Sequence, residues 1–197
     1  IASREPELEP LTSEEELRWS RTRGAMGANA HERLRQLSIL QLGAGRIGSL
    51  MAFQWAALGV KRLTLIDRDV MGLENLDAMP NLTTCDAKHR RLKVSALQRR
   101  LIAYRPDMVV HAAPLEVNRR EIETLVRASD LIVTCVDSDT PRLAAAMWSY
   151  RFLKPHLDVA SNITNEPNGE RLLSADVRLL LPQQGCVCCV GGRSEEH

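Results

Sequence analysis

The sequence predicts an α/β domain built on a doubly wound, mostly parallel sheet. From residue 37 onward, short apolar runs alternate with longer segments of helical periodicity. A repeated strand–helix–strand order of this kind is typical of parallel sheets with right-handed crossovers. After residue 170 the apolar runs continue with no helical segment between them, which favours antiparallel strands added near the C-terminus.

The individual elements follow from the same patterns. Apolar runs of about four to eight residues are typical of buried strands. Strands are therefore expected at 37–42, 62–69, 108–115, 131–137 and 156–160, with added antiparallel strands in 171–182. Helices are expected near 46–58, 88–103, 118–128 and 140–152.

The residues before the first strand form a separate region. Proline and acidic residues dominate its beginning, which indicates a flexible lead-in. Ser13 is followed three residues later by Glu16, a capping-box pattern that predicts a helix ending before Gly24. The expected divisions are a lead-in at 1–12, a helical segment at 13–36, a main domain at 37–190 and a tail at 191–197.

Composition and charge exclude several functional classes. The 197 residues include 26 Lys plus Arg and 25 Asp plus Glu, so a formal charge of +1 gives no bulk attraction to nucleic acid or anionic membranes. Aromatic residues make up 4% of the chain, too few for a base-stacking platform. No run approaches the ~20 apolar residues of a membrane span. We therefore expect a cytoplasmic protein that binds neither nucleic acid nor a membrane.

A glycine-rich loop, GAGRIG, joins the first expected strand to the first helix of the sheet. Its residues Gly43, Ala44, Gly45 and Gly48 would permit a tight turn and a close approach of the backbone to a phosphate, at a helix N-terminus that favours anions. Asp67 ends the next strand, where a carboxylate accepts hydrogen bonds from ribose hydroxyls. This arrangement predicts an adenine nucleotide in a Rossmann-like domain.

Two classes of nucleotide-dependent protein fit this loop. An NAD(P)-dependent oxidoreductase uses the same loop and acidic residue, and Arg68 would offer a partner for a 2′-phosphate. An ATP-binding enzyme fits equally well. The motifs further along the chain separate the two.

Those motifs resemble one family in their order. After the second strand the chain reads DRDVMGLENLDAMP, CDAKHRRLKVSALQRRL, SDLIVTCVDSDTPR and DVRLLLPQQGCVCC, and RWSR precedes the sheet. From about Leu17 to Val190 the chain thus resembles the ThiF/MoeB-type adenylyltransferases, relatives of ubiquitin-activating enzymes. The resemblance implies that residues 37–190 are an ATP-binding adenylation domain, with truncation of that domain left open. Such a domain uses ATP and Mg²⁺ to adenylate the C-terminal carboxylate of a ubiquitin-like or sulfur-carrier protein.

The resemblance also implies roles for individual residues. Asp67 would hold the ribose, while Asn75 and Lys93 would approach the phosphates. Asp137, at the end of the fourth strand, would coordinate Mg²⁺, which prefers oxygen ligands. Arg21 matches a family arginine that reaches the nucleotide of the neighbouring subunit, which implies a homodimer or a pseudo-dimer with a partner chain.

Each of these residues also has a structural alternative. Lys93 belongs to a basic helical run, which is usually a solvated face. Asp137 could cap the following helix, and Asn75 could be an ordinary loop residue. We expect Asp69, Asp139 and Arg142 to have structural roles or to support the residues that contact the ligand.

One departure from the family pattern bears on catalysis. Three residues beyond Asn75 the family commonly has an arginine, and this chain has Ala78. Loss of a fixed cation beside a triphosphate costs about 3 kcal/mol of transition-state stabilisation by analogy with one lost oxyanion donor. A non-catalytic nucleotide-binding or scaffolding member of the same fold is therefore an alternative. Arg46, inside the glycine loop, is expected to supply the missing charge.

The cysteines raise the question of zinc. Cys186 and Cys189 form a CxxC pair, and many relatives bind structural zinc through two such pairs, because four thiolates close a tetrahedral site. This sequence contains no second pair, so a zinc site and reduced, unliganded thiols both remain open. Cys135 is expected to be a core residue, and neither it nor Cys85 is assigned a covalent role.

Overall fold

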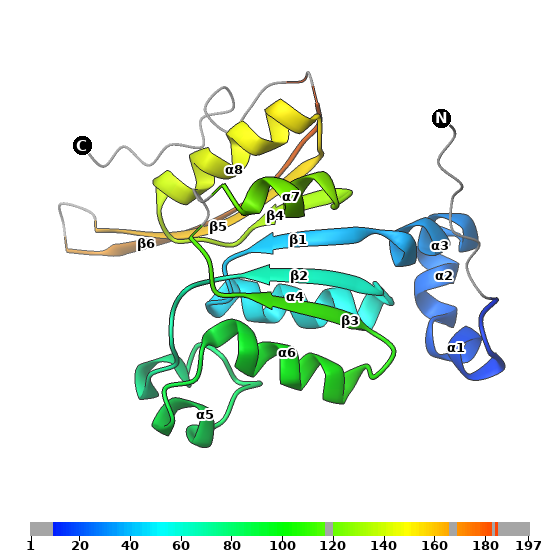
Figure 1. Cartoon of the computed structure of the whole chain (residues 1–197), viewed down its shortest axis with the longest axis horizontal. Helices are drawn as coiled ribbons and strands as arrows, with labels where there is room; N and C mark the ends of the chain where they lie inside the picture. The colour runs from blue at the N-terminus through cyan, green and yellow to red at the C-terminus, as the bar shows by residue number, and fades with distance from the viewer. Residues whose placement is uncertain (1–9, 117–119, 166–168, 183, 185–197) are drawn as a thin grey trace.

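The computed structural model describes residues 10–116, 120–165, 169–182 and 184. Its strands are β1 (Ser38–Leu42), β2 (Arg62–Ile66), β3 (Val109–Ala113), β4 (Leu131–Thr134), β5 (His156–Asn165) and β6 (Arg171–Leu180). Within the described residues they form one six-stranded sheet with the order β3-β2-β1-β4-β5-β6 (Figure 1).

The strand directions confirm the predicted doubly wound sheet. Strands β1 to β5 run parallel, and β6 runs antiparallel to β5. One difference concerns the added strands, because β5 extends beyond the expected 156–160 to Asn165 and pairs along its whole length with one long strand, β6. The order of the strands reverses between β1 and β4, and in open α/β sheets ligands bind at such a switch point.

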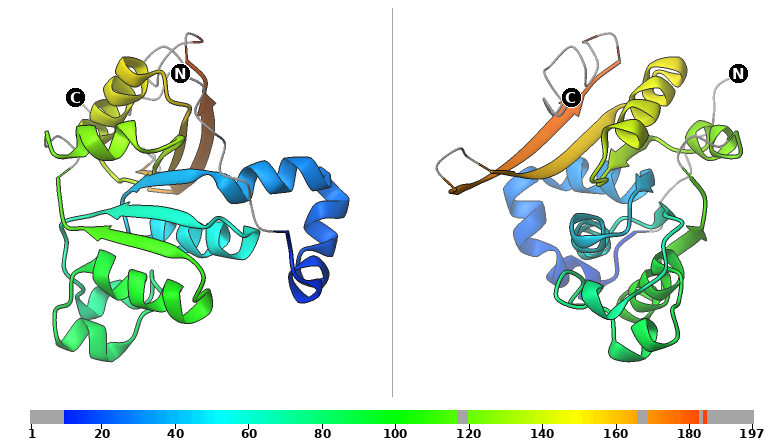
Figure 2. Two further views of the ribbon diagram at one scale, coloured as in Figure 1. Left: turned by 45° about the vertical axis from the view of Figure 1, so that its right-hand side comes forward. Right: turned by 90° about the vertical axis from the view of Figure 1, so that its left-hand side faces the viewer.

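Helices cover both faces of the sheet. They are α4 (Arg46–Leu58), α6 (Lys93–Tyr104), α7 (Ile122–Arg127) and α8 (Asp139–Phe152). The crossover from β2 to β3 also contains η1 (Leu73–Asn75) and α5 (Thr84–Lys88). Helices α4 and α6 lie on one face, and α7 and α8 lie on the other (Figures 1 and 2).

The strand side chains divide into two apolar layers, because successive residues of a strand point to opposite faces. Ile39, Leu63 and Leu65 pack in the layer with α4 and α6. Leu40 and Leu42 pack in the layer with α7 and α8. Burial on both faces explains why these strands are continuous apolar runs in the sequence.

One face of the β5–β6 strand pair is less covered than the rest of the sheet. Ile163, Leu173, Val177 and Leu179 share one face of this pair of strands, as their register shows, and each is at least 59% exposed. Contiguous exposed apolar surface of this kind marks an interaction face more often than scattered single residues do. This end of the sheet is therefore left open by the described residues.

The N-terminal region forms three short helices, α1 (Ser13–Arg18), α2 (Ser20–Met26) and α3 (Ala28–Gln36). The expected capping box at Ser13 is wrong by one residue, because Thr12 caps α1 in a reciprocal pair with Glu15. The helix that begins there ends before Gly24, as expected, at Arg18, but a second helix follows it. Helix α2 passes through Gly24 and ends at Gly27, whose φ of 88° breaks the helix.

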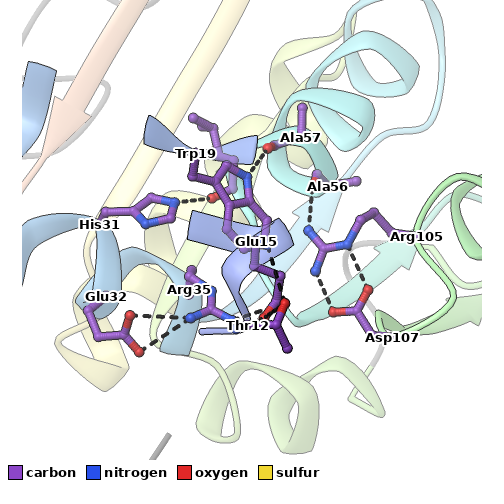
Figure 3. Close-up of polar contacts among 11 residues, drawn as sticks. Thr12, Glu15, Trp19, His31, Glu32, Arg35, Ala56, Ala57, Arg105 and Asp107 are labelled. Atoms are coloured by element: carbon purple, nitrogen blue, oxygen red, sulfur yellow. Dashed lines mark hydrogen bonds and ion pairs between the residues drawn. The ribbon is translucent and has the colours of Figure 1, made fainter. Parts of the chain in front are cut away.

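These helices pack against the C-terminal end of α4, as Figure 1 shows. The last carbonyls of a helix lack partners within it. Here Trp19 Nε1 donates to Ala57 O at 2.7 Å, and His31 Nε2 lies 2.9 Å from Leu58 O (Figure 3). Arg105 Nη1 donates to Ala56 O at 2.8 Å. Three side chains thus satisfy this end of α4.

The same cluster buries two arginines against the Trp19 ring. The Arg35 and Arg105 guanidinium carbons lie 5.0 Å and 5.1 Å from its centroid, in the range of cation–π contacts. Arg35 pairs with Glu32 and Arg105 with Asp107, so neither buried charge is left unpaired (Figure 3). The cluster fixes the N-terminal helices to the domain.

Candidate functional site

A cleft of about 670 Å³ lies where β1, β2 and β4 end, at the switch point of the sheet. This volume is in the usual range for small-molecule sites. Its walls come from the glycine loop, the segment after β2, the start of α6, and the loop from β4 to α8. The residues that the sequence singled out for nucleotide binding largely surround this one cleft.

The glycine loop requires glycine at two of its positions. Gly43 has φ of 98°, and a Cβ there would lie 2.4 Å from the Cys135 carbonyl oxygen. A Cβ on Gly48 would lie 2.1 Å from the Gly43 carbonyl oxygen. Gly45 faces open space and lines the cleft at the N-cap of α4, which has no side-chain cap. The first N–H groups of α4 are therefore available to an anion.

A buried glutamine, which the sequence analysis missed, holds this loop together. Gln41 Nε2 donates to Gly43 O at 3.0 Å and to Gly48 O at 2.8 Å, and its side chain is completely buried. The signal was present in the sequence, because Gln41 is a polar residue within an otherwise apolar strand. A buried amide in that position has to satisfy nearby backbone groups.

Asp67 lines the cleft directly after β2 and is tied to two backbone segments. Its Oδ2 accepts the Ala44 N–H at 2.8 Å, and its Oδ1 accepts the Asp69 N–H at 2.8 Å. Ala44 itself is buried, so its contribution is through the backbone. These bonds orient the carboxylate at the place where the sequence predicts a ribose.

Lys93 reaches the cleft because the expected helix over 88–103 is interrupted. The chain turns at Arg90, with φ of 46°, and α6 begins at Lys93 itself. The Lys93 side chain is 13% exposed, and its Nζ lies 2.9 Å from Asp69 Oδ2. Lys93 therefore does not lie on a solvated face, and Asp69, for which we expected a structural role, also lines the cleft.

Arg46 also lines the cleft, and it pairs with Asp77 at 3.3 Å. Both side chains are mostly exposed, so this pair is open to exchange with an anion. Ala78, which follows Asp77, packs with a small apolar cluster around Met71 and Met79. At the position where the family commonly has an arginine, this chain thus has a side chain that packs in an apolar cluster.

Two predicted residues lie away from the cleft. Asn75 Oδ1 accepts the Gly72 N–H at 2.9 Å and closes the η1 turn, as the loop-residue alternative expects. Arg21 is exposed on α2, beside the end of α4 that is remote from the glycine loop (Figure 1). Neither is among the residues that line this chain's own cleft.

Asp137 lies in the loop between β4 and α8 and lines the cleft. It does not cap α8, because the N-cap is Ser138. Among the described residues, its exposed carboxylate makes no hydrogen bond or ion pair. An exposed carboxylate without a partner, beside a nucleotide-sized cleft, fits an oxygen-preferring cation such as Mg²⁺.

The cysteines of the described chain offer no reactive centre in this cleft. Burial raises the pKa of the Cys135 thiol to about 12, so it remains protonated as a wall residue. Cys85 is exposed on α5, outside the cleft, with its Sγ 3.5 Å from His89 Nδ1. Cys186 and Cys189 lie outside the described residues. Within the described part, no cluster of three or more His, Cys, Asp or Glu side chains could hold a metal ion.

The helices of the described segments also bear on the membrane question. None of them combines the length and apolar character needed to cross a bilayer.

Comparisons with known proteins extend this picture. Residues 19–194 match the model of the ThiF family. The sulfur carrier protein ThiS adenylyltransferase of Bacillus subtilis is 28% identical over 118 residues, which are 60% of this chain and 35% of that protein. The molybdopterin-synthase adenylyltransferase of Haemophilus influenzae is 27% identical over 130 residues, which are 65% of this chain and 53% of that protein.

A solved structure shares the fold. E. coli MccB, crystallised with ATP, superimposes with a TM-score of 0.71 over 91% of this chain and 52% of its own, at 21% identity. The chain thus spans about a third to a half of the length of these relatives.

Proposed function

Because this chain belongs to the ThiF family, we propose that it binds ATP with Mg²⁺ in the cleft and adenylates the C-terminal carboxylate of a ubiquitin-like or sulfur-carrier protein. The observation that carries the proposal is the convergence on one cleft of Asp67, the open N-terminus of α4, Lys93 and Asp137. Asp67 would bind the ribose, the N-terminus of α4 and Lys93 would bind the phosphates, and Asp137 would bind the cation.

The proposed reaction is the attack of a carboxylate oxygen on the α-phosphorus of ATP. A new P–O bond forms to the carrier's carboxylate while the bond to the β-phosphate oxygen breaks, and pyrophosphate leaves. Two anions approach each other and a third departs, so catalysis depends on positioning and charge neutralisation. Lys93 and Arg46 would neutralise phosphate charge by exchanging Asp69 and Asp77 for phosphate oxygens.

Asp137 would hold Mg²⁺, which is usually bound through one or two carboxylates plus phosphate oxygens. When bound, the cation supplies positive charge beside the phosphates. The role of this chain's own residues is to present the Asp137 carboxylate toward the cleft, free of competing partners among the described residues. A structural zinc site at Cys186 and Cys189 remains a prediction beyond the described residues.

The position of Arg21 supports a homodimer in which this residue serves the partner's nucleotide. Helix α4 has 13 residues and so spans about 20 Å, and α2 packs at the end opposite the glycine loop. Mixing Arg21→Ala with Asp137→Ala tests this arrangement. Two inactive variants that regain activity when mixed would support exchange between subunits, and mixtures as inactive as their components would contradict it.

An NAD(P)-dependent oxidoreductase is the alternative from a different class. Arg68, which would take a 2′-phosphate, is already paired with Glu116 at the cleft. Calorimetric titration with ATP plus Mg²⁺, and in parallel with NADH and NADPH, separates the classes. We expect saturable binding of ATP with Mg²⁺ and no binding of NADH or NADPH. Binding of a nicotinamide cofactor without ATP binding would overturn the proposal.

Catalysis requires a further test, because a scaffolding member of the family would also bind ATP. Isotope exchange between pyrophosphate and ATP, measured with purified candidate carrier proteins, is expected to depend on the carrier's free C-terminal carboxylate. A carrier with an amidated C-terminus is the matched control. ATP binding without exchange for any carrier tested would favour the non-catalytic alternative.

A further inference from the structure

Buried polar side chains join β4 to β5, next to the loop that carries Asp137. Asp158 on β5 is 1% exposed, and its Oδ1 accepts the Thr134 hydroxyl at 2.5 Å across the strand pair. Thr134 Oγ1 also lies 2.9 Å from His156 Nε2. Because the Thr134 hydroxyl donates its single hydrogen to Asp158, it has to accept from His156, which carries its proton on Nε2.

Arg142, in the first turn of α8, connects this carboxylate to the loop above it. Its Nε lies 3.2 Å from Asp158 Oδ1. Its Nη2 donates to Val136 O at 3.2 Å, and its Nη1 donates to Asp139 Oδ1 at 3.0 Å. One planar guanidinium therefore holds the chain on both sides of Asp137, with its side chain only 11% exposed.

We propose that Asp158 and Arg142 are positioning residues that hold the Asp137 carboxylate for Mg²⁺–ATP. This inference rests on the proposed function. Asp137 makes no side-chain bond of its own among the described residues, so its direction depends on the backbone at Val136 and Asp139. Groups that orient a metal-binding carboxylate contribute to metal affinity without touching the metal.

The charges in this network explain why both residues are needed. Arg142 brings a positive charge close to the carboxylate that is to bind a cation. Asp158 is buried and forms an ion pair with the Arg142 guanidinium, so it offsets part of that charge. Without Asp158, Arg142 would keep Asp139 as a carboxylate partner but would lose part of the compensation of its charge, which disfavours a cation at Asp137.

The test compares ATP binding with and without the cation. For Asp158→Asn, calorimetry is expected to show the Kd for Mg²⁺–ATP rising by about tenfold or more, the range found when partners of metal-ligating groups are lost. The Kd for ATP in EDTA is expected to stay within about twofold, because Gln41 and Asp67, which hold the glycine loop, form no hydrogen bond or ion pair with Asp158 or Arg142 in the described part of the chain. Arg142→Lys keeps the charge but loses the planar fork, and it is expected to act in the same direction.

Ser149→Ala is the matched control. Ser149 is buried on the same helix, where its hydroxyl donates to Lys154 O at 2.7 Å, far along α8 from the Asp137 loop. It is expected to lower thermal stability while leaving both ATP titrations unchanged. If Asp158→Asn does not fold, Arg142→Lys provides the same comparison.

The outcomes separate this inference from the proposed function. Suppose that the wild-type protein binds Mg²⁺–ATP. If the variants then lose equal affinity for ATP with and without Mg²⁺, or lose none, only the positioning role is overturned. Wild-type protein that binds no Mg²⁺–ATP would overturn the proposed function, and the inference with it.

Discussion

The two ends of helix α4 show how one element serves both stability and binding. At its C-terminal end, Trp19, His31 and Arg105 satisfy the last carbonyls and are themselves buried. At its N-terminal end, the cap is Gly45, no side chain caps the helix, and the neighbouring cations pair with exchangeable carboxylates. The difference indicates that groups closed off by the fold contribute stability, while groups left open are available to a ligand.

The largest expected effect is at the closed end. Trp19→Ala removes a ring that is 2% exposed and contacts two buried arginines, so the free energy of unfolding should fall by about 3–5 kcal/mol. Urea denaturation measures this change. The Kd for ATP should stay within about twofold of wild type where the variant is folded, because the two ends are separate.

Trp19→Phe sharpens this comparison. It keeps an aromatic ring but leaves the Ala57 carbonyl without its donor, so a loss of about 1–3 kcal/mol is expected. A fall in ATP affinity that parallels the fall in stability in either variant would show that the two ends of α4 are coupled.

His156 is expected to make the free energy of unfolding depend on pH, by an amount similar to these losses. Burial lowers the pKa of His156 to about 4, from an ordinary value of 6.5. Between these values the unfolded chain binds more protons, so the stability present above pH 6.5 is lost as the pH falls toward 4. The shift corresponds to about 3 kcal/mol.

His156→Gln isolates this contribution, because its amide can still donate to Thr134. Unfolding measured from pH 7.5 to pH 4 should be less sensitive to acid in this variant by up to ~3 kcal/mol. His111→Gln, at an exposed position on β3, should follow the wild-type curve. Identical pH dependence in His156→Gln and wild type would contradict the buried, neutral state of His156.

At the open end, Lys93→Met should affect binding more than stability. Removal of the charge should weaken ATP binding by about tenfold or more, the size of one hydrogen bond to a charged group, about 1.5–3 kcal/mol. The free energy of unfolding should change by no more than about 1 kcal/mol, because the partner carboxylate of Asp69 is mostly exposed. Lys88→Met, in the same basic run but exposed, is the control, and an equal loss of affinity in both variants would indicate a non-specific charge effect.

The smallest expected effect concerns Arg46, whose side chain is 61% exposed. Arg46→Ala should weaken ATP binding by less than about 1 kcal/mol, since exposed charge interactions are screened. Asp77→Asn should shift the Kd in the opposite direction, because it frees Arg46 from its carboxylate. Calorimetry on both variants measures the sign, and two shifts in the same direction would exclude Arg46 as a phosphate ligand.

Much of the sheet was predictable from the sequence, because strands buried on both faces are continuous apolar runs. The helical boundaries were less so. Thr12 and Ser13 are each followed three residues later by a glutamate, so the pattern permits two capping boxes and only packing selects between them. The helix break at Arg90, which directs Lys93 into the cleft, could not be predicted because no glycine or proline lies next to it.

The candidate site was predictable where a residue type has a defined geometric task, as for Gly43, Gly48 and Asp67. It was less predictable where a side chain acts through the backbone. Gln41 is conspicuous in the sequence as a polar residue in an apolar strand, but the partners of Gln41 and Asp158 become known only when the surrounding carbonyls and side chains are placed. For Asn75 the motif predicts a contact with the phosphates, whereas in the structure its side-chain amide closes a local turn.

The locked glycine loop also bears on how quickly a nucleotide can bind. Gln41 and Asp67 together fix the loop before any ligand arrives. Binding therefore requires no ordering of this segment, and the conformational entropy of the loop is lost during folding of the chain. For the proposed nucleotide we therefore expect association to be limited by encounter and by the exchange of ion pairs, without a prior rearrangement of the glycine loop.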